Sequence, residues 1–587
     1  MSELEGILGI KFPKGIKISH ATNDSKKVKK DSIFFGLQGT QAHGSKYINE
    51  ALKLGASIVV HDDPKYKADK NANIFYLEDL EKIDFYEFLN QLYFHENNKR
   101  KHDYDMQFVN ISGITGTNGK TTTAMLCHQI VQTEKGSDSI YIGTLGASYN
   151  NGEFFTSFSR NTTPNIFEFF EIITFFKNKY KLFKHGDGKD MHIFLEVSSH
   201  ALDQNRLKNV PFDNAAILNI EHDHIDYHKD LESYVDAKFK IRQQNITRAF
   251  YRESDRPTVF VNIDSPEVYK KLKTIINEEQ HLRPKWDYHD EYFNTVSNNE
   301  SKSADFKYEI LNSNSKETEV KFSLGNHSVI KFKTNLFLDF NITNLIFAIL
   351  LTRKSFMLFH HEDLSTTNGY DEELWSDKIR EQIKGVYDNS WDYGKESPGK
   401  DDTYWKPSYL EEVAFELDFE NHQDNFALNL KMPKGRSELL DKLKNNIPVN
   451  IIIDYAHNPD AFETFLSSTK NYFENLITVF GCGGNRDKLK RPDMLKKAIK
   501  YSSQVVFTSD NSRDEEFKEI LKDASEGNNL DNVIAIEDRK EAIMHASKLL
   551  KDKDCLVILG KGHEVTQEIN GKISHFSDHE VINEIYN

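Results

Sequence analysis

Gly113-Ile114-Thr115-Gly116-Thr117-Asn118-Gly119-Lys120-Thr121-Thr122-Thr123 lies between an apolar run at 108–111 and a helical pattern at 124–131. A glycine-rich turn that connects a strand to a helix directs its backbone N–H groups at one point, where the helix N-terminus adds a positive dipole. Lys120 can reach the β- and γ-phosphates of a nucleotide there, and the Thr121 hydroxyl can bind Mg²⁺. The stretch therefore predicts a nucleotide-phosphate loop, although Ile114 stands where the usual Gly-x-x-x-x-Gly-Lys-Thr motif has its first glycine. A turn that only caps a helix is the weaker interpretation, because Lys-Thr-Thr-Thr follows directly.

The composition indicates a large protein with substantial hydrophobic cores. A length of 587 residues is typical of three or four domains, and a hydrophobic content of 38% with 41 Phe and 25 Tyr excludes global disorder. The net charge of −16 argues against a nucleic-acid or membrane partner but leaves room for a local basic pocket. Three cysteines without metal-ligand spacing, an N-terminus without a signal pattern and only short apolar runs fit a cytoplasmic protein.

The alternation of apolar strands and helical patterns predicts several α/β units. Residues 1–105 read as a small α/β unit that ends in a polar, linker-like stretch. From 106 to 352, apolar strands alternate with helical patterns, which is typical of a parallel sheet covered by helices. A second series, within 435–587, predicts a separate doubly wound domain. The segment between them, 353–434, holds three of the four Trp and many charges, and we interpret it as an insertion of unknown role.

Two polar segments follow buried-looking strands of the central unit. Because ligands of open α/β sheets lie beyond the carboxyl ends of the strands, Glu196 is expected to help hold the Mg²⁺ that Thr121 contacts. Glu221–His228 follows the next strand and contains three His and three acids within eight residues, which indicates a polar site. Zinc would suit these ligand types, but the segment lacks a second ligand pair at helical spacing.

Four strand ends of the C-terminal unit carry polar or glycine-rich loops. Such loops meet at one edge of a doubly wound sheet, so they predict a second site there. The loops are Asp454–Asp460, Gly481–Asp487, Ser509–Arg513 and Gly560–Glu564.

Together these motifs resemble those of the Mur ligases, and in particular the MurE branch, which adds the third residue of the peptidoglycan stem peptide. The resemblance spans nearly the whole chain outside 353–434. It rests on 116–122, 196–200, Asp223-His224, 454–459 and 481–487. It implies a three-domain α/β fold: a UDP-substrate-binding domain at 1–105, a central P-loop ATPase domain at 106–352 and a C-terminal Rossmann-like, amino-acid-binding domain at 435–587.

The resemblance implies an ADP-forming, ATP-dependent carboxylate–amine ligase of peptidoglycan synthesis. Its substrates would be UDP-N-acetylmuramoyl-L-alanyl-D-glutamate and meso-diaminopimelate, with ATP and Mg²⁺ as cofactors. A carboxylate is a poor electrophile, so the γ-phosphate of ATP would first convert it to an acyl phosphate, from which the amine displaces phosphate. The protein is then expected to be a cytoplasmic monomer that serves cell wall biogenesis, cell shape and cell division.

The same resemblance implies which residues act at the nucleotide and the metal. Lys120, Lys238, His224 and Glu196 would be catalytic, and Lys238 matches the lysine that the family carries as a carbamate. The metal would be held by Thr121, Glu196, His224 and carbamylated Lys238. The implied ATP contacts are Gly116, Thr117, Asn118, Gly119, Lys120, Thr121, Thr122, Arg436, Asp454, His457 and Asn458.

The implied contacts to the UDP-muramoyl peptide come from both the first and the second domain. In the family's Asp-Ser-Arg motif, this chain has Lys26 in place of the arginine, which removes a planar guanidinium. The contacts are Ser25, Thr40, Gln41, Ala42, Asn161, Thr162, Thr163, Ser198, Gln204 and Arg206.

The added amino acid is implied by the loop Asp510-Asn511-Ser512-Arg513, which resembles the Asp-Asn-Pro-Arg loop of diaminopimelate-adding members. Arg513 can grip the extra carboxylate of diaminopimelate through a bidentate pair, and Glu564 can receive its distal ammonium. Ser512 replaces the proline of the motif. The implied amino-acid contacts are Arg486, Asp510, Asn511, Ser512, Arg513, Gly560 and Glu564.

Two alternatives stay open from the sequence. The same ligase reaction could use L-lysine or another amino acid in place of diaminopimelate. The chain could also be a catalytically silent nucleotide-binding homologue whose 353–434 segment recruits a partner.

Overall fold

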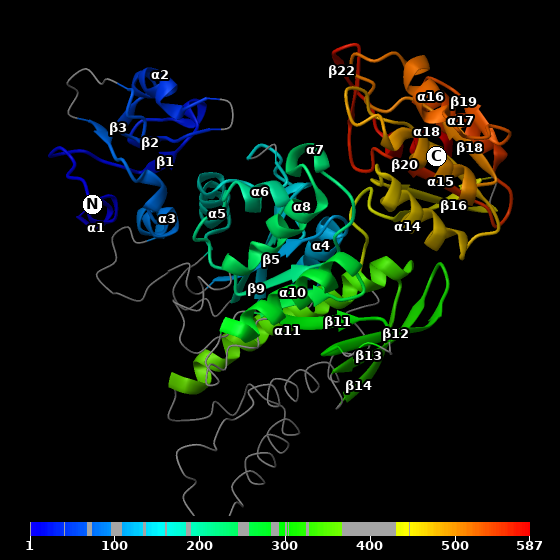
Figure 1. Cartoon of the computed structure of the whole chain (residues 1–587), viewed down its shortest axis with the longest axis horizontal. Coiled ribbons are helices and arrows are strands. Elements are labelled where there is room, and N and C mark those ends of the chain that lie inside the picture. Colours follow the sequence, from blue (N-terminus) through cyan, green and yellow to red (C-terminus); the bar gives the residue numbers. More distant parts are fainter. Residues whose placement is uncertain are drawn as a thin grey trace, which may run out of the picture.

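The computed structural model contains three main sheets, one in each predicted domain (Figure 1). The residues that it describes are 2–39, 42–66, 73–94, 109–132, 137–158, 161–182, 190–244, 258–282, 293–299, 302, 304–324, 328–366, 430–444 and 447–586.

The N-terminal unit is a four-stranded parallel sheet in the order β1-β2-β3-β4. The small α/β unit predicted within residues 1–105 is confirmed, since these strands alternate with helices. The elements are α1 (Ser2–Leu8), β1 (His20–Thr22), β2 (Ser32–Gly36), α2 (Ile48–Lys53), β3 (Ala56–His61), β4 (Ile74–Tyr76) and α3 (Phe85–Phe94).

The central unit is a ten-stranded sheet in the order β14-β13-β12-β11-β10-β9-β5-β8-β6-β7. Its strands are β5 (Val109–Thr115), β6 (Ser137–Gly143), β7 (Gly146–Tyr149), β8 (Asp190–Glu196), β9 (Asn214–Ile217), β10 (Thr258–Asn262), β11 (Phe293–Ser297), β12 (Phe306–Ser313), β13 (Thr318–Leu324) and β14 (Ser328–Thr334). Its helices are α4 (Lys120–Val131), α5 (Ile166–Tyr180), α6 (Ser199–Asp203), α7 (Ile225–His228), α8 (Leu231–Phe239), α10 (Pro266–Leu282) and α11 (Asp339–Thr366).

The central sheet is mixed, whereas the sequence predicted a parallel one. In the order of the sheet, the strands from β12 to β6 run parallel to one another. The antiparallel additions lie at the two edges: β7 pairs with β6, and β13 and β14 form a meander with β12. The meander was missed because a strand with one solvated face lacks the continuous apolar run of a doubly covered parallel strand. In β12, for example, only Tyr308 is fully buried.

The C-terminal unit is a six-stranded sheet in the order β15-β16-β20-β17-β18-β19, with a separate hairpin formed by β21 and β22. The predicted doubly wound character is confirmed, because the strands from β16 to β19 in this order pair in parallel, and β15 is an unpredicted antiparallel edge. The elements are β15 (Glu438–Lys444), β16 (Ile447–Asp454), α14 (Pro459–Lys470), β17 (Leu476–Phe480), α15 (Lys490–Tyr501), β18 (Gln504–Phe507), α16 (Phe517–Ser525), β19 (Val533–Ala535), α17 (Arg539–Leu549), β20 (Cys555–Leu559), β21 (Thr566–Ile569), β22 (Lys572–His575) and α18 (Asp578–Tyr586).

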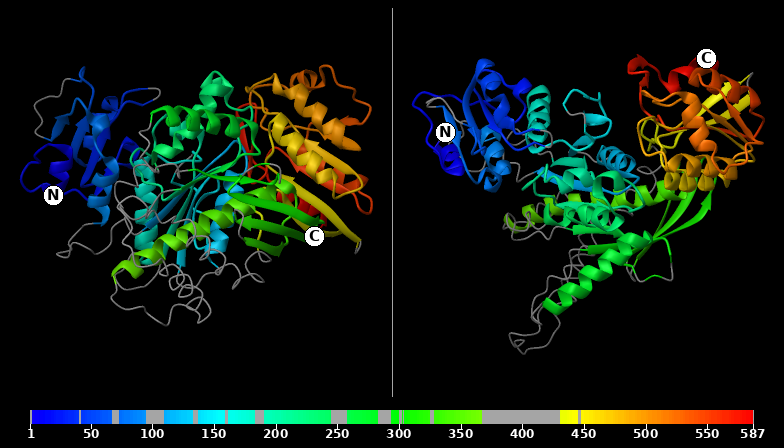
Figure 2. Two further views of the ribbon diagram at one scale, coloured as in Figure 1. Left: turned by 60° about the horizontal axis from the view of Figure 1, so that its bottom comes forward. Right: turned by 45° about the horizontal axis from the view of Figure 1, so that its top comes forward.

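Helix α5 joins the N-terminal unit to the central sheet (Figures 1 and 2). Its Phe167 ring lies 5.4 Å from that of Phe35 and 5.2 Å from that of Phe85, both in the N-terminal unit. Lys27 adds an ion pair to Glu171 of α5 at 2.9 Å. The two units therefore pack against each other through apolar side chains, with an ion pair beside this contact.

The long helix α11 covers one face of the central sheet together with α4 and continues past residue 352, where the sequence analysis placed a domain boundary. The ring of Phe337, just before α11, lies 5.3 Å from that of Tyr472 in the C-terminal unit. Residues 367–429 of the predicted insertion lie outside the described residues, so its role stays open. Among the described residues, no helix has the length and apolar character that crossing a bilayer requires.

Candidate active site

The predicted nucleotide loop connects β5 to α4, as the sequence analysis expected. Gly119 ends the loop with φ of +86°, a conformation that favours glycine, and a Cβ there would lie 2.4 Å from Asn344 Oδ1. Helix α4 then begins at Lys120, so its first backbone N–H groups face the loop. The turn therefore has the geometry of an anion cradle at a helix N-terminus.

The Lys120 side chain folds over the loop. Its Nζ donates to the carbonyl oxygens of Gly116 at 2.8 Å and Thr117 at 2.9 Å. Burial lowers the pKa of Lys120, and the positive charge of Arg436, from the C-terminal unit, acts in the same direction. A phosphate bound at this point would offset the positive charges of Lys120 and Arg436.

Glu196 ends β8, and its side chain is fully buried beside the loop. One carboxylate oxygen accepts from Thr121 Oγ1 at 2.9 Å and Thr144 Oγ1 at 3.0 Å. The other accepts from Thr144 N at 3.0 Å and Tyr141 O–H at 2.5 Å. The structure thus brings together Glu196 and Thr121, and it adds Tyr141 and Thr144, which the sequence analysis missed because neither belongs to a recognisable motif.

Lys238 and His224 lie near the same loop. Lys238 is 1% exposed, and its Nζ donates to the same Gly116 carbonyl at 2.7 Å. Burial, followed by the charge of Lys120, lowers the pKa of Lys238 well below that of a free lysine. His224 has φ of +53°, and burial lowers its pKa to about 4, which leaves the imidazole neutral at pH 7.

These side chains suit a magnesium ion. The carboxylate of Glu196 and the hydroxyl of Thr121 are hard oxygen donors, which Mg²⁺ prefers. In the described part of the chain, no three His, Cys, Asp or Glu side chains are grouped as a metal site by themselves. A Mg²⁺ ion here would therefore need nucleotide phosphates and water as further ligands, which is its usual manner of binding.

The predicted peptide contacts of the central unit form one connected surface. Thr163 Oγ1 donates to Glu196 O at 2.8 Å and accepts from Ser198 N at 2.9 Å. Arg206 donates to Thr163 O at 3.3 Å and to Gln204 Oε1 at 2.9 Å. This surface therefore begins next to Glu196.

The remaining peptide contacts are less closely tied to that surface. Thr162 Oγ1 lies 3.3 Å from Thr144 Oγ1, and Asn161 precedes it in the same loop. In the N-terminal unit, Ser25 donates to Glu50 Oε2 at 2.8 Å, and Ala42 follows β2. Thr40 and Gln41 lie outside the described residues.

The predicted ATP contacts of the C-terminal unit lie around the end of β16 and the start of α14. Asp454 ends β16 and accepts from Ser437 N at 2.6 Å and Ala456 N at 2.7 Å. The Arg436 guanidinium lies 4.4 Å from the centre of the Tyr455 ring. Asn458 caps α14 by accepting from Ala461 N at 2.8 Å.

Electrostatic coupling shows that these residues approach the central site. Burial lowers the pKa of His457, and the carboxylate of Asp223 opposes that shift. Burial raises the pKa of Glu221 to about 6, and the carboxylate of Asp460 adds to it. Groups on the two units therefore influence one another across the gap between them.

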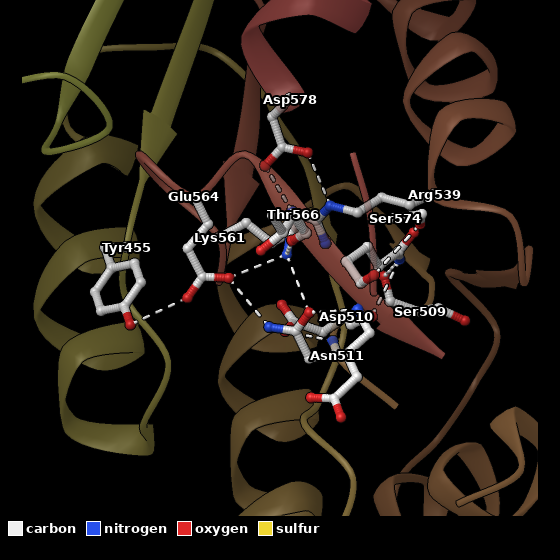
Figure 3. A network of polar contacts seen from close by, with 12 residues as sticks. Tyr455, Ser509, Asp510, Asn511, Arg539, Lys561, Glu564, Thr566, Ser574 and Asp578 are labelled. Carbon is white, nitrogen blue, oxygen red and sulfur yellow. Dashed lines mark hydrogen bonds and ion pairs between the residues drawn. The ribbon is translucent and has the colours of Figure 1, made fainter. Parts of the chain in front are cut away.

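Three of the predicted amino-acid contacts, Asp510, Asn511 and Glu564, lie close together in the loops after β18 and β20 (Figure 3). Glu564 Oε2 accepts from Asn511 Nδ2 at 3.1 Å, and Glu564 Oε1 accepts from Tyr455 O–H at 3.3 Å. Arg513 Nη1 donates to Gly484 O at 2.7 Å, while Arg513 Nε lies 3.6 Å from Glu568.

The other predicted members surround this group. A Cβ at Gly560 would lie 2.7 Å from Asp510 Oδ2, so glycine is required for the close approach. Ser512 is buried, and Arg486 is exposed at the edge of the group. Sequence reasoning missed Tyr455 and Lys561, although each stands inside a loop that it had singled out.

Comparisons with known proteins give the family of this chain. Three family profiles match the chain: "Mur ligase family, catalytic domain" at 17–89, "Mur ligase middle domain" at 114–352 and "Mur ligase, glutamate ligase domain" at 435–562. The chain belongs to the Mur ligase family.

Among similar relatives, the UDP-N-acetylmuramoyl-L-alanyl-D-glutamate–2,6-diaminopimelate ligase of Aquifex aeolicus is 32% identical, over 97% of this chain and 94% of its own. The enzyme of the same name from Clostridium perfringens is 30% identical, over 97% and 95%.

Solved structures share the fold. One of a UDP-N-acetylmuramoyl-L-alanyl-D-glutamate–2,6-diaminopimelate ligase has a TM-score of 0.57 at 23% identity and covers 99% of this chain and 98% of its own. The MurF ligase of Thermotoga maritima in complex with ADP has a TM-score of 0.51 at 13% identity and covers 98% of each chain. These comparisons confirm the three-domain ligase architecture expected from the sequence.

Proposed function

We propose that this protein is the ATP-dependent ligase that joins meso-diaminopimelate to UDP-N-acetylmuramoyl-L-alanyl-D-glutamate in peptidoglycan synthesis. The observation that carries the proposal is the combination of a phosphate loop on the central unit with a charged amine site on the C-terminal unit. The relatives that match nearly the whole chain bear the name of this activity.

The proposed reaction begins at the phosphate loop. The loop N–H groups and Lys120 hold the β- and γ-phosphates, so that the charge on the transferring phosphoryl group is offset when the substrate carboxylate attacks it. The surface of Thr163, Ser198 and Arg206 holds the peptide, and its direct contact with Glu196 brings the carboxylate near the phosphates. The product of this step is an acyl phosphate and ADP.

The second step uses the C-terminal unit. The amine of the bound amino acid attacks the acyl phosphate, a tetrahedral intermediate forms, and phosphate leaves with the C–O bond electrons. Glu564 receives the distal ammonium, and Arg513 pairs with the distal carboxylate that L-lysine lacks. Because the reacting atoms must come within about 3–3.5 Å, the two units must hold them together.

We further propose that Thr121 and Glu196 hold a Mg²⁺ ion, with His224 and a carbamate on Lys238 nearby. The ion would neutralise phosphate charge during the transfer. A lysine amine must be neutral to react with carbon dioxide, and burial, which lowers the pKa of Lys238 well below that of a free lysine, favours the neutral form. As proposed, the enzyme acts as a cytoplasmic monomer and serves cell wall biogenesis and, through it, cell shape and division.

The test is phosphate release from ATP and Mg²⁺ in the presence of UDP-N-acetylmuramoyl-L-alanyl-D-glutamate, with meso-diaminopimelate or L-lysine as the amine. We expect release with diaminopimelate alone. Release with L-lysine would keep the reaction but contradict the assignment of Arg513. Binding of ATP without release in either case would favour a silent nucleotide-binding protein.

A further inference from the structure

Lys561 is the buried centre of the amine site, although the proposed reaction has no direct use for it (Figure 3). It follows β20 in the segment Gly560-Lys561-Gly562-His563-Glu564, and its side chain is 0% exposed. A buried ammonium is costly unless all of its hydrogens are paired. The hydrogen-bond partners of the Lys561 ammonium therefore indicate the role of this buried charge.

Three acceptors from three different segments surround the Lys561 ammonium. Its Nζ donates to Thr566 O at 2.7 Å, to Glu564 Oε2 at 3.1 Å and to Asn511 Oδ1 at 3.4 Å. An ammonium has three hydrogens and no lone pair, so this set uses its full capacity. Lys561 consequently joins the loop after β18, the loop after β20 and the β21–β22 hairpin at one point.

This arrangement fixes which way the Asn511 amide faces. Asn511 Oδ1 accepts from Lys561 Nζ and from Glu568 N at 3.0 Å, which forces its Nδ2 toward Glu564 Oε2 at 3.1 Å. In the reverse orientation, the amide oxygen would face the carboxylate and the amide nitrogen would face two donors. Lys561 thereby sets the hydrogen-bonding pattern of the predicted amino-acid contact.

The same contacts leave one oxygen of Glu564 for a ligand. Oε2 is held by Lys561 and Asn511, while Oε1 has the longer bond of 3.3 Å from Tyr455 O–H, and the side chain is 28% exposed. A carboxylate held by two donors on one side presents its other oxygen in a fixed direction. A substrate ammonium can then bind without the entropy cost of ordering Glu564.

We infer that Lys561 is a positioning residue of the amine site, which orients Glu564 and Asn511 for the distal ammonium of a diamino acid. This inference rests on the proposed function, and it concerns a residue that touches other side chains rather than the substrate. It predicts a selective effect of Lys561 on the binding of the amino acid, with the nucleotide and peptide sites unaffected.

The test compares Lys561→Met with the matched control Lys553→Met. Both lysines flank β20, one at each end, and each pairs with a glutamate at 3.1 Å, but Lys553 is 68% exposed and lies away from the site. Met fills the buried space without a charge, and the partly exposed Glu564 can be hydrated when its partner is lost. We expect Lys561→Met to raise the KM for diaminopimelate about tenfold or more, as expected for loss of a charged hydrogen-bond network.

Several readouts separate positioning from a general loss of structure. The KM values for ATP and for the UDP substrate should stay within about twofold of the wild type, since those sites lie on other segments. In a Glu564→Gln background, Lys561→Met should add little further effect, because the carboxylate that it orients is already absent. Lys561→Gln, which keeps a donor, should show the same pattern more weakly and serves if the Met variant does not fold.

The outcomes distinguish this inference from the proposed function. A wild-type enzyme without diaminopimelate-dependent phosphate release would contradict the proposed function itself. An active wild type whose Lys561→Met variant keeps its KM for diaminopimelate would overturn the inference. Parallel losses at all three substrates, or independent effects of the two substitutions in the double variant, would also overturn it.

Discussion

At the residue scale, the Gly116 carbonyl accepts hydrogen bonds from two ammonium groups, those of half-buried Lys120 and buried Lys238. Burial lowers the pKa of both lysines, and the positive charge of Lys120 lowers that of Lys238 further, so an anion beside them would be stabilised. The nucleotide loop is therefore a site prepared for negative charge before any nucleotide binds.

We expect Lys120→Met to reduce kcat by about 10²–10³-fold or more, because it removes a charged donor from the transferring phosphoryl group. The melting temperature should not fall, since the substitution also removes a poorly compensated buried charge. Coupled phosphate-release kinetics and a thermal melt measure the two quantities. Turnover close to the wild-type value would show that Lys120 does not contact the phosphates.

Glu221 supplies a pH-dependent test. Its pKa is raised from 4.5 to about 6, chiefly by burial and then by Asp460, so the folded state binds its proton more tightly than the unfolded chain does. The stability that this proton provides is fully present below about pH 4.5 and is lost as the pH rises through about 6. Glu221→Gln should therefore stabilise the protein at pH 7 by roughly 1–2 kcal/mol, and this advantage should vanish near pH 4.5.

Thermal melts of both proteins between pH 4.5 and pH 8 check this expectation. The neutral glutamine can still accept from Asn118 Nδ2, which donates to Glu221 at 2.8 Å in the wild type. A difference in melting temperature that does not change across this range would contradict the raised pKa.

At the element scale, helices α17 and α18 are joined by two ion pairs, one buried and one exposed. Arg539 and Asp578 form a bidentate pair at 2.8 and 2.9 Å, with both side chains at 0% exposure (Figure 3). Lys540 and Glu584 join the same helices at the surface, with side chains about half exposed. Loss of one partner leaves a desolvated charge without a counterion in the buried pair, whereas water can replace the lost partner at the surface. The loss should therefore destabilise the protein much more at the buried pair.

We expect Asp578→Asn to destabilise the protein by about 3–5 kcal/mol, since it leaves the buried Arg539 charge without its counterion. The control Glu584→Gln should cost at most about 1 kcal/mol, as exposed pairs do. Denaturant unfolding of the C-terminal unit gives both values. Equal effects of the two substitutions would mean that burial does not determine the strength of these links.

The elements also show how far the sequence could predict the molecule. Runs of mostly apolar residues, such as those at β10, β17 and β20, predicted the parallel strands, because strands covered on both faces need such runs. The antiparallel strands β12 to β14 were missed because their outward faces carry polar residues. Loop motifs predicted both sites, whereas the contacts of Tyr141 with Glu196 and of Lys561 with Asn511 join residues far apart in the chain and could not be assigned from sequence alone.

At the scale of the whole molecule, the site is divided between two units that each contribute a cation. Arg436 of the C-terminal unit helps to lower the pKa of Lys120 on the central unit, so the two charges oppose close approach of the units. A polyphosphate between them would replace repulsion with attraction on both sides. Nucleotide binding and domain closure should therefore be coupled.

We expect ADP with Mg²⁺ and the UDP substrate to reduce the radius of gyration in solution X-ray scattering. The same ligands should have a weaker effect on Arg436→Met, which lacks one of the two cations that the phosphates would join. High salt should narrow the difference between the two proteins, because it screens charges near the surface. An unchanged scattering profile in the wild type would contradict a ligand-driven closure.

The contact between Gly435 and Gly562 gives the C-terminal unit a further property. A Cβ at Gly562 would lie 2.7 Å from Gly435 O and 2.8 Å from Tyr455 Cβ, so the two backbones touch without any side chain between them. One of these loops leads into Arg436, a predicted ATP contact, and the other carries Lys561 and Glu564. A side chain at Gly435 or Gly562 would therefore force the two loops apart, and with them the predicted ATP side and the predicted amino-acid side of this unit.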